Sequence, residues 1–359
     1  MQAFRDELVC PDTPRLPERF FDRFVFNLHR TDATVPSILF GLGIYPASDT
    51  VDGFAILVTE SEQRNVRFST ELSAAVGSGT GGSSTGASST VGSRTGPFSW
   101  RIVEPMRTWH VALGPNPTGL EFDVTWRARA PAWHGEVRVT DGDRVSASFG
   151  HLFQSGRYDG TLSIDGHRQR IEGWYGQRDR SRGVRTMSGG QGLHLWFQAQ
   201  FPDRSVGFLL VEDRQHGRRL LEGAVMHEAG RLDPITDVRH ALRFDGSLDL
   251  RAGTVEVTTA SGTVYLIQAD ASAAGGGYMA GGGYGGQHGR PMGRDHVEHD
   301  VYPLDGSVSA RTLASSLTDR LAAFTWDGIP GIGIVEFAHT RSGSYAYRPS
   351  LPPSPGLPG

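Results

Sequence analysis

The sequence predicts an all-β protein made of two antiparallel domains, and three observations carry this prediction. Most of the 359-residue chain reads as short runs in which apolar residues alternate with polar ones, the period of a β-strand. Asp-Gly and Ser-Gly dipeptides separate several of these runs, as they do in hairpins. No long helical period precedes residue 183, and the length suits two domains of about 150–180 residues.

The first half of the chain contains a run of expected strands. Residues 1–20 are polar and dotted with prolines, which predicts an N-terminal arm, and residues 21–186 are expected to form the first domain. The phenylalanines that begin at Phe20 favour a first strand or helical turn that contributes to the core, with packing of the arm across an apolar opening as the alternative. Four residues farther on share one face at period two: Leu120, Phe122, Val124 and Trp126.

Three tracts have the composition of mobile segments. Residues 77–96 are almost entirely Gly, Ser and Thr, which predicts a disordered loop inside the first domain. Residues 274–289 are rich in glycine and predict a flexible loop, with a lid whose tyrosines contact a ligand as the alternative. From residue 341 to residue 359, Ser, Tyr and Pro predict a disordered tail.

The second domain is expected over residues 187–340 and again consists of short strand patterns separated by turns. Residues 193–201 and 294–302 read as strands, and residues 332–337 read as a closing strand. Residues 313–324 carry apolar residues at spacings of four, four and three, which predicts the one sizeable helix of the chain. A barrel that binds a ligand inside itself is favoured over a sandwich.

The most unusual stretch is residues 173–185, which holds two aromatics, one acid, four arginines and three glycines. Asp165-Gly166 before it is a type I′ hairpin signal. We expect a strand to end at Tyr175 and residues 177–182 to leave the sheet at the mouth of the domain. If residues 147–154 and 167–175 then flank a strand at residues 157–164, His151 and Asp179 approach the same end.

Asp179 stands between Arg178 and Arg180, and this arrangement has two interpretations. One is an ion-pair network that pins a linker between the domains. The other is a carboxylate held in an apolar mouth and oriented by Arg178, where it transfers a proton or holds a polar ligand group.

The region from residue 149 through Gly183 resembles the signature of the hydroxyneurosporene synthase (carotenoid hydratase) and AttH-like superfamily. Members share a short G-x-x-x-R-D-H-x-W-G segment, which corresponds here to residues 173–183 with changes. The resemblance implies two tandem lipocalin-like barrels packed together, a fold shared with lipocalin-type fungal Diels–Alderases. Arg180 and Arg182 stand where the family has histidine and tryptophan, so the surroundings of the acid differ.

The resemblance also implies a site. The family's His-x-Trp and Tyr-x-Asp pairs correspond to His151 with Phe153 and to Gln177 with Asp179. We therefore expect His151 and Asp179 to be catalytic, since a histidine beside an aspartate supplies an oriented acid or base near neutral pH. The residues expected to bind substrate are Phe153, Trp174, Tyr175, Gln177 and Arg178.

The function that follows is the binding of a hydrophobic small molecule, such as an isoprenoid, polyene or polyketide, in a barrel cavity. Acid-assisted hydration would begin with proton transfer from Asp179 to a carbon–carbon double bond, and nearby aromatic rings would shelter the cation. Isomerisation or cyclisation are the related reactions. A non-catalytic carrier of lipids or isoprenoids and a purely structural junction between the barrels are the alternatives.

Several classes of function are not expected. The net charge of −4 argues against a nucleic-acid partner, and no apolar run is long enough for a membrane span, so a cytoplasmic protein is expected. The glycine tracts lack the Lys-Ser/Thr of a phosphate loop, and no cofactor is expected. His296, Glu298 and Asp300 share one strand face that could hold zinc, but a solvated face is favoured and no metal is expected. The oligomeric state stays open.

Overall fold

The computed structural model describes residues 6, 16–77, 92–141, 144–185 and 191–352 of the chain. Within these segments nearly all regular structure is strand. The short elements of other kinds are α1 (Leu72–Gly77) and the 3-10 turns η1 (Pro46–Ser48) and η2 (Met279–Gly282). The prediction of an all-β protein is confirmed.

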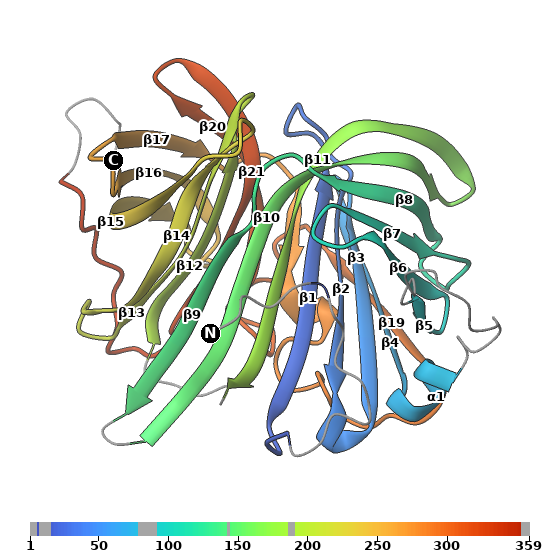
Figure 1. The fold of residues 1–359 in the computed structure, drawn as a ribbon. Helices are drawn as coiled ribbons and strands as arrows, with labels where there is room; N and C mark the ends of the chain where they lie inside the picture. Colours follow the sequence, from blue (N-terminus) through green and yellow to red (C-terminus); the bar gives the residue numbers. More distant parts are fainter. Residues whose placement is uncertain (1–5, 7–15, 78–91, 142–143, 186–190, 353–359) are drawn as a thin grey trace.

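The N-terminal half forms one antiparallel sheet that curls into an open half-barrel (Figure 1). Its strands are β1 (Phe20–His29), β2 (Ser37–Tyr45), β3 (Thr50–Val58), β4 (Glu62–Glu71), β5 (Gly92–Thr95), β6 (Phe98–Glu104), β7 (Thr108–Leu113), β8 (Leu120–Ala128), β9 (Trp133–Asp141), β10 (Arg144–Ile164), β11 (His167–Arg185) and β19 (His296–Pro303). β1 lies between β2 and β11, and β10 pairs with β11 on one side and with β8 and β9 on the other. β19 comes from the second half of the sequence and pairs with β4.

The C-terminal half forms a closed barrel of eight antiparallel strands. They are β12 (Gln191–Gln200), β13 (Arg204–Asp213), β14 (Arg218–His227), β15 (Leu232–Phe244), β16 (Leu250–Thr259), β17 (Val264–Asp270), β20 (Thr318–Trp326) and β21 (Ile329–His339). Pairing of β17 with β20 closes the ring, and the short β18 (Gly276–Tyr278) adds to the other end of β20. The expected tandem of lipocalin-like β-domains is confirmed, with the first domain open and the second closed.

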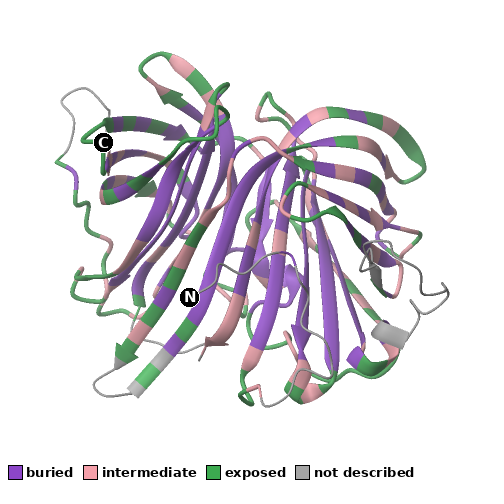
Figure 2. Cartoon of the chain, in the orientation of Figure 1, coloured by how far each residue is buried: buried purple, intermediate pink, exposed green. Residues whose placement is uncertain are grey.

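Burial along the strands reflects what covers each face of the sheet. β7 and β8 alternate between buried and more exposed residues, because one face packs on the core and the other meets solvent. β2 and β3 are buried at every position, and Figure 2 shows such continuous burial along the central strands. These central strands are therefore covered on both faces, which places them between the two domains or under another segment.

β10 and β11 form one long hairpin whose turn is Asp165-Gly166. Both turn residues have positive φ, 52° and 82°, so the predicted type I′ turn is confirmed. The expectation that residues 177–182 leave the sheet is wrong, because pairing with β1 on one side and β10 on the other keeps them in β11 as far as Arg185. Residues 147–154 and 157–164 are likewise one continuous strand, β10, and not neighbouring strands.

The glycine-rich tract of residues 274–289 packs against the N-terminal sheet. Met279 and Tyr284 join an apolar cluster with Phe54 of β3. A Cβ on Gly281 would lie 2.1 Å from Asn65 Oδ1, so glycine is what permits this close approach. The segment expected to be a flexible loop therefore packs against the sheet, and its glycines permit this packing.

The helix expected over residues 313–324 is also wrong. β20 begins at Thr318, and its neighbours β17, β18 and β21 supply the backbone partners of a strand. Pairing on both edges outweighs the local apolar spacing. The strands expected near residues 294–302 and 332–337 are confirmed as β19 and β21.

The remaining tracts divide between described and undescribed residues. The expected disordered tail is wrong for residues 341–352, which contact the barrel: the Tyr347 hydroxyl accepts a hydrogen bond from the Leu242 amide at 2.7 Å. Residues 353–359 lie outside the described part. Of the expected loop at residues 77–96, residues 92–95 form β5 and residues 78–91 lie outside the described part. The strand interpretation of the first phenylalanines is confirmed by β1.

Candidate functional site between the domains

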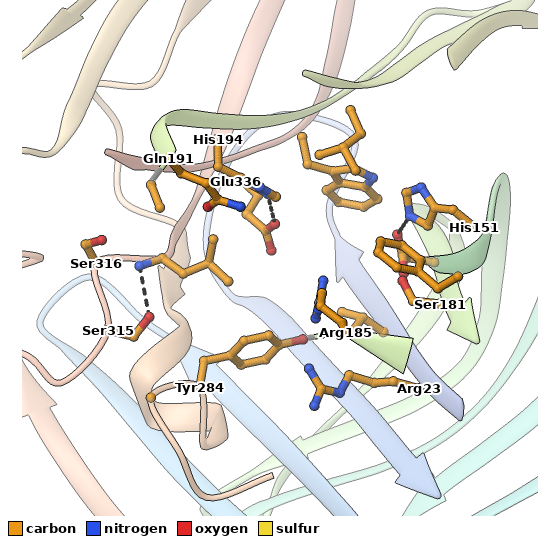
Figure 3. A pocket seen from close by; sticks show the side chains of 18 of the residues that line it. Arg23, His151, Ser181, Arg185, Gln191, His194, Tyr284, Ser315, Ser316 and Glu336 are labelled. Carbon is orange, nitrogen blue, oxygen red and sulfur yellow. Dashed lines mark hydrogen bonds and ion pairs between the residues drawn. The ribbon is translucent and has the colours of Figure 1, made fainter. Parts of the chain in front are cut away.

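A cavity of about 560 Å³ lies between the two sheets (Figure 3). β1, β10 and β11 line it from the N-terminal side, and β12, β13 and β21 line it from the barrel. The segment after η2 and residues 315–317 complete the wall. The interiors of both domains are filled by apolar clusters. The ligand was expected inside a barrel, whereas this cavity lies at the interface between the domains.

His151 and Asp179 meet at this cavity, with 2.5 Å between His151 Nε2 and Asp179 Oδ2. In the register of β10 and β11, His151 is opposite Ser181 and Phe153 is opposite Asp179, so the pair is a diagonal cross-strand contact. The second ring nitrogen, Nδ1, contacts the carboxylate of Glu222 from β14. The imidazole thus lies between two carboxylates that come from different domains.

Glu222 reaches His151 through space left by Gly135 of β9. Gly135 is opposite His151 in register, and a Cβ there would lie 1.4 Å from Glu222 Oε2. The indole nitrogen of Trp133 lies 3.4 Å from the same oxygen and donates to it. The absence of a side chain at Gly135 therefore positions Glu222 against the histidine.

The charge state of His151 follows from its surroundings. Burial lowers the pKa of His151, but the charges and hydrogen bonds of Asp179 and Glu222 outweigh burial and raise this pKa to about 10. At neutral pH the ring therefore carries both protons and donates one to each carboxylate. The Asp179 side chain is 16% exposed and that of Glu222 is 7% exposed, so Asp179 is the carboxylate that a molecule in the cavity meets.

Another part of the wall holds a second acidic group. His194 Nε2 of β12 lies 2.9 Å from Glu336 of the neighbouring β21. Asp319 of β20 is buried beside them. Burial and then the charge of Glu336 hold the pKa of Asp319 well above its usual range.

A third part of the wall is basic. Arg23 of β1 and Arg185 at the end of β11 line the cavity together with Tyr284 from the segment after η2 (Figure 3). Burial and then the charge of Arg23 lower the pKa of Arg185. Both guanidinium groups stay charged at neutral pH, because an arginine does not lose its proton in proteins.

The aromatic residues expected to bind substrate do not line this cavity. Phe153 is fully buried and packs its ring 5.5 Å from that of His151. Trp174 belongs to the apolar core of the half-barrel. The ring of Tyr175 lies under the guanidinium of Arg129, at 4.9 Å.

Gln177 and Arg178 do not line the cavity either. Gln177 is fully buried, and neither polar atom of its side-chain amide has a hydrogen-bond partner among the described residues. Arg178 pairs with Asp6 at 2.5 Å and lies over the rings of Trp109 and Trp126, inside the half-barrel. It does not orient Asp179, as the sequence had suggested, because adjacent residues of a strand point to opposite faces.

Sequence reasoning missed Glu222, Glu336, Arg23 and Arg185. Glu222 and Glu336 had a local signal, since each is an acid inside a mostly apolar strand. Arg23 and Arg185 had no comparable signal, because arginines are frequent throughout this chain.

The described segments hold no group of three or more His, Cys, Asp or Glu residues arranged to bind a metal ion. Glu298 and Asp300, on the strand face weighed for zinc, both pair with Arg67 of β4. No helix in the described part of the chain is long and apolar enough to cross a membrane.

The fold and the cavity define a tandem lipocalin-like protein with a candidate site between its domains. The chain belongs to a family of unknown function, DUF8625, whose sequence profile matches residues 13–270. No curated protein matches its sequence.

Solved structures resemble the chain over most of its length. An AttH candidate (NE1406) from Nitrosomonas europaea has 11% identity and a TM-score of 0.59, and the match covers 92% of this chain and 99% of that chain. Kievitone hydratase from Nectria haematococca has 11% identity and a TM-score of 0.48, covering 93% of each chain. CghA with Sch210972 has 11% identity and a TM-score of 0.48, covering 94% of each chain. The AttH-like fold expected from residues 149–183 is confirmed.

Proposed function

We propose that this protein is an enzyme that moves a proton on a small molecule bound between its two domains, with His151 and Asp179 as the catalytic residues. One observation carries the proposal: an imidazolium lies between two carboxylates, and one of them, Asp179, faces the cavity. Such an arrangement supplies a base whose changes in charge are stabilised by an adjacent cation.

The chemistry that suits this pair is proton abstraction followed by proton return. An imidazolium with a pKa of about 10 is too weak an acid to protonate an isolated double bond, so we propose a substrate activated by a carbonyl. In hydration, Asp179 removes a proton from water as the oxygen adds to the β-carbon, and then returns it to the α-carbon. In isomerisation or cyclisation the proton leaves one carbon and returns to another atom of the same molecule.

Apolar side chains support a substrate with an apolar body. Val25 and Phe149 line the cavity from the N-terminal sheet, and Trp196 and Leu209 line it from the barrel. Glu222 acts as a positioning residue in this scheme, because it contacts His151 and does not line the cavity. The runner-up is a non-catalytic carrier that binds the same kind of molecule without transferring a proton.

The test begins with the small molecule that co-purifies with the protein, extracted and identified by mass spectrometry. Incubation of that molecule with the protein in D₂O should introduce deuterium at carbon. Asp179→Asn should slow this exchange by about a hundredfold or more, because the base is lost. Asp123→Asn is the matched control, since Asp123 forms an exposed pair with His110 at 2.9 Å and neither residue lines the cavity. Binding without exchange in the wild type would identify a carrier instead.

A further inference from the structure

Arg23 and Arg185 differ in their partners from the arginines that are buried inside the two domains. The guanidinium groups inside the two domains pair with aspartates at 2.5–2.8 Å: Arg178 with Asp6, Arg180 with Asp22 and Arg320 with Asp249. Across the described ranges, no acidic side chain lies within ion-pair distance of Arg23 or Arg185. Two positive charges therefore share one wall of the cavity, and no carboxylate of the described residues forms an ion pair with either of them.

The groups that do surround these arginines are aromatic. Arg23 donates from Nη2 and Nε to the Tyr45 hydroxyl, at 2.8 and 3.1 Å, but its Nη1 is buried and has no partner within the described segments. The Arg185 guanidinium lies 5.3 Å from the Phe21 ring and 5.4 Å from the Phe149 ring. Aromatic faces stabilise a cation but accept no strong hydrogen bond, so Nη1 of Arg23 and the guanidinium of Arg185 keep donors available for a ligand.

The acids of the cavity wall are each paired with a histidine and not with Arg23 or Arg185. Asp179 is paired with His151, and Glu336 is paired with His194. The Arg23 side chain is 8% exposed, so water compensates its free Nη1 poorly. An anion that entered the cavity would remove both the charge repulsion and the unsatisfied donor.

We propose that Arg23 and Arg185 form a carboxylate-binding subsite, so that the substrate of the reaction proposed above is a small organic acid with an apolar body. Arginine suits a carboxylate because its planar fork donates two parallel hydrogen bonds. The Tyr284 ring lies 5.3 Å from the Arg23 guanidinium, which places a further hydroxyl donor at the same wall. The carboxylate fixes one end of the molecule, and the rest extends over the apolar wall towards Asp179.

The test compares two probes of nearly equal shape, 2-naphthoate and 2-naphthamide, by isothermal titration calorimetry with the full chain. The wild type should bind the acid at least tenfold more tightly than the amide, because a buried charged contact contributes more than about 1.4 kcal/mol, or a factor of ten. Arg185→Gln should remove this preference without weakening amide binding. Arg185→Lys should retain part of it. Arg170→Gln, on an exposed arginine at 80% side-chain exposure, should leave it unchanged.

Two outcomes overturn the subsite. One is wild-type protein that binds the acid no more tightly than the amide, absence of binding included. The other is a preference that survives in both Arg185→Gln and Arg23→Gln, with folding checked by circular dichroism. The proposed function fails separately: Asp179→Asn should still bind 2-naphthoate, since it removes a negative charge, while deuterium exchange is lost. Exchange that persists in Asp179→Asn, together with loss of acid preference in Arg185→Gln, would reject the reaction and keep the subsite.

Discussion

The two faces of β11 around Asp179 serve different purposes. Arg178 and Arg180 point into the half-barrel, where both are fully buried and paired with Asp6 and Asp22. Asp179, between them in sequence, points to the opposite face and lines the cavity between the domains. A single step along the strand therefore separates residues that hold the fold together from a residue proposed to act on a substrate.

This comparison shows how an Arg-Asp-Arg sequence should be interpreted on a strand. Consecutive side chains alternate between faces, so neighbours in sequence are not neighbours in space. The hypothesis that Asp179 is clamped by Arg178 and Arg180 is wrong, since each arginine has an aspartate partner from the N-terminal part of the chain. The partner of Asp179 is His151, on the adjacent strand.

The largest expected effect is on the free energy of unfolding and comes from substitution on the buried face of β11. Arg180→Met leaves the fully buried Asp22 without its partner, so the free energy of unfolding should fall by about 3–5 kcal/mol, measured by urea denaturation. Arg170→Met, at an exposed position, should change it by less than about 0.5 kcal/mol. Equal effects of the two substitutions would break the distinction between the faces.

The next largest effect is the pH dependence of the contribution that His151 makes to folding stability. Its pKa rises from an ordinary 6.5 to about 10 on folding, so its contribution to stability is fully present below pH 6.5 and is lost as pH rises through 10. The difference in unfolding free energy between wild type and His151→Gln, measured by urea denaturation, should therefore shrink by a few kcal/mol from pH 6 to pH 10. A difference that stays constant with pH would contradict a histidine charged by Asp179 and Glu222.

The smallest expected effect is on the rate of deuterium exchange and comes from substitution at the cavity, at Asp179 on β11 and His151 on β10. Asp179→Asn and His151→Gln should each lower the rate of deuterium exchange by about a hundredfold, or about 2.7 kcal/mol, and the double variant should lose little more. This non-additivity is expected because the two side chains act as one unit. A double variant whose loss is the product of the single losses would mean that the residues act independently.

The pairing of His151 with Asp179 was predicted from the sequence, but the route to it was not. The expected geometry had three adjacent strands, whereas β10 is one strand of 21 residues and the contact is a diagonal across the β10–β11 ladder. The resemblance over residues 149–183 predicted that His151 and Asp179 lie together, because it matched residue types and did not depend on strand boundaries. Boundaries depend on pairing partners elsewhere in the chain, and here β1 holds residues 178–184 in the sheet.

Glycine content was the least reliable predictor of which segments pack against the rest of the protein. Residues 274–289 have the composition of a flexible loop, yet they cover β2 and β3 and bring Tyr284 to the cavity. Composition reports the entropy that a segment loses on ordering, but not the surface against which it packs. Gly135 is a second example, because the space that a side chain at this position would occupy is taken by Glu222 from the other domain.

The sequence by itself determined the all-β class, the hairpin turn at Asp165-Gly166 and the strands of period two, because these depend on residues close together in the chain. The tertiary structure alone decided where the cavity lies, which carboxylate joins His151 from the other domain and which arginines line the cavity wall. Each of these depends on side chains that meet across two different sheets. No local period or spacing encodes such a meeting, since it is set by how the domains pack together.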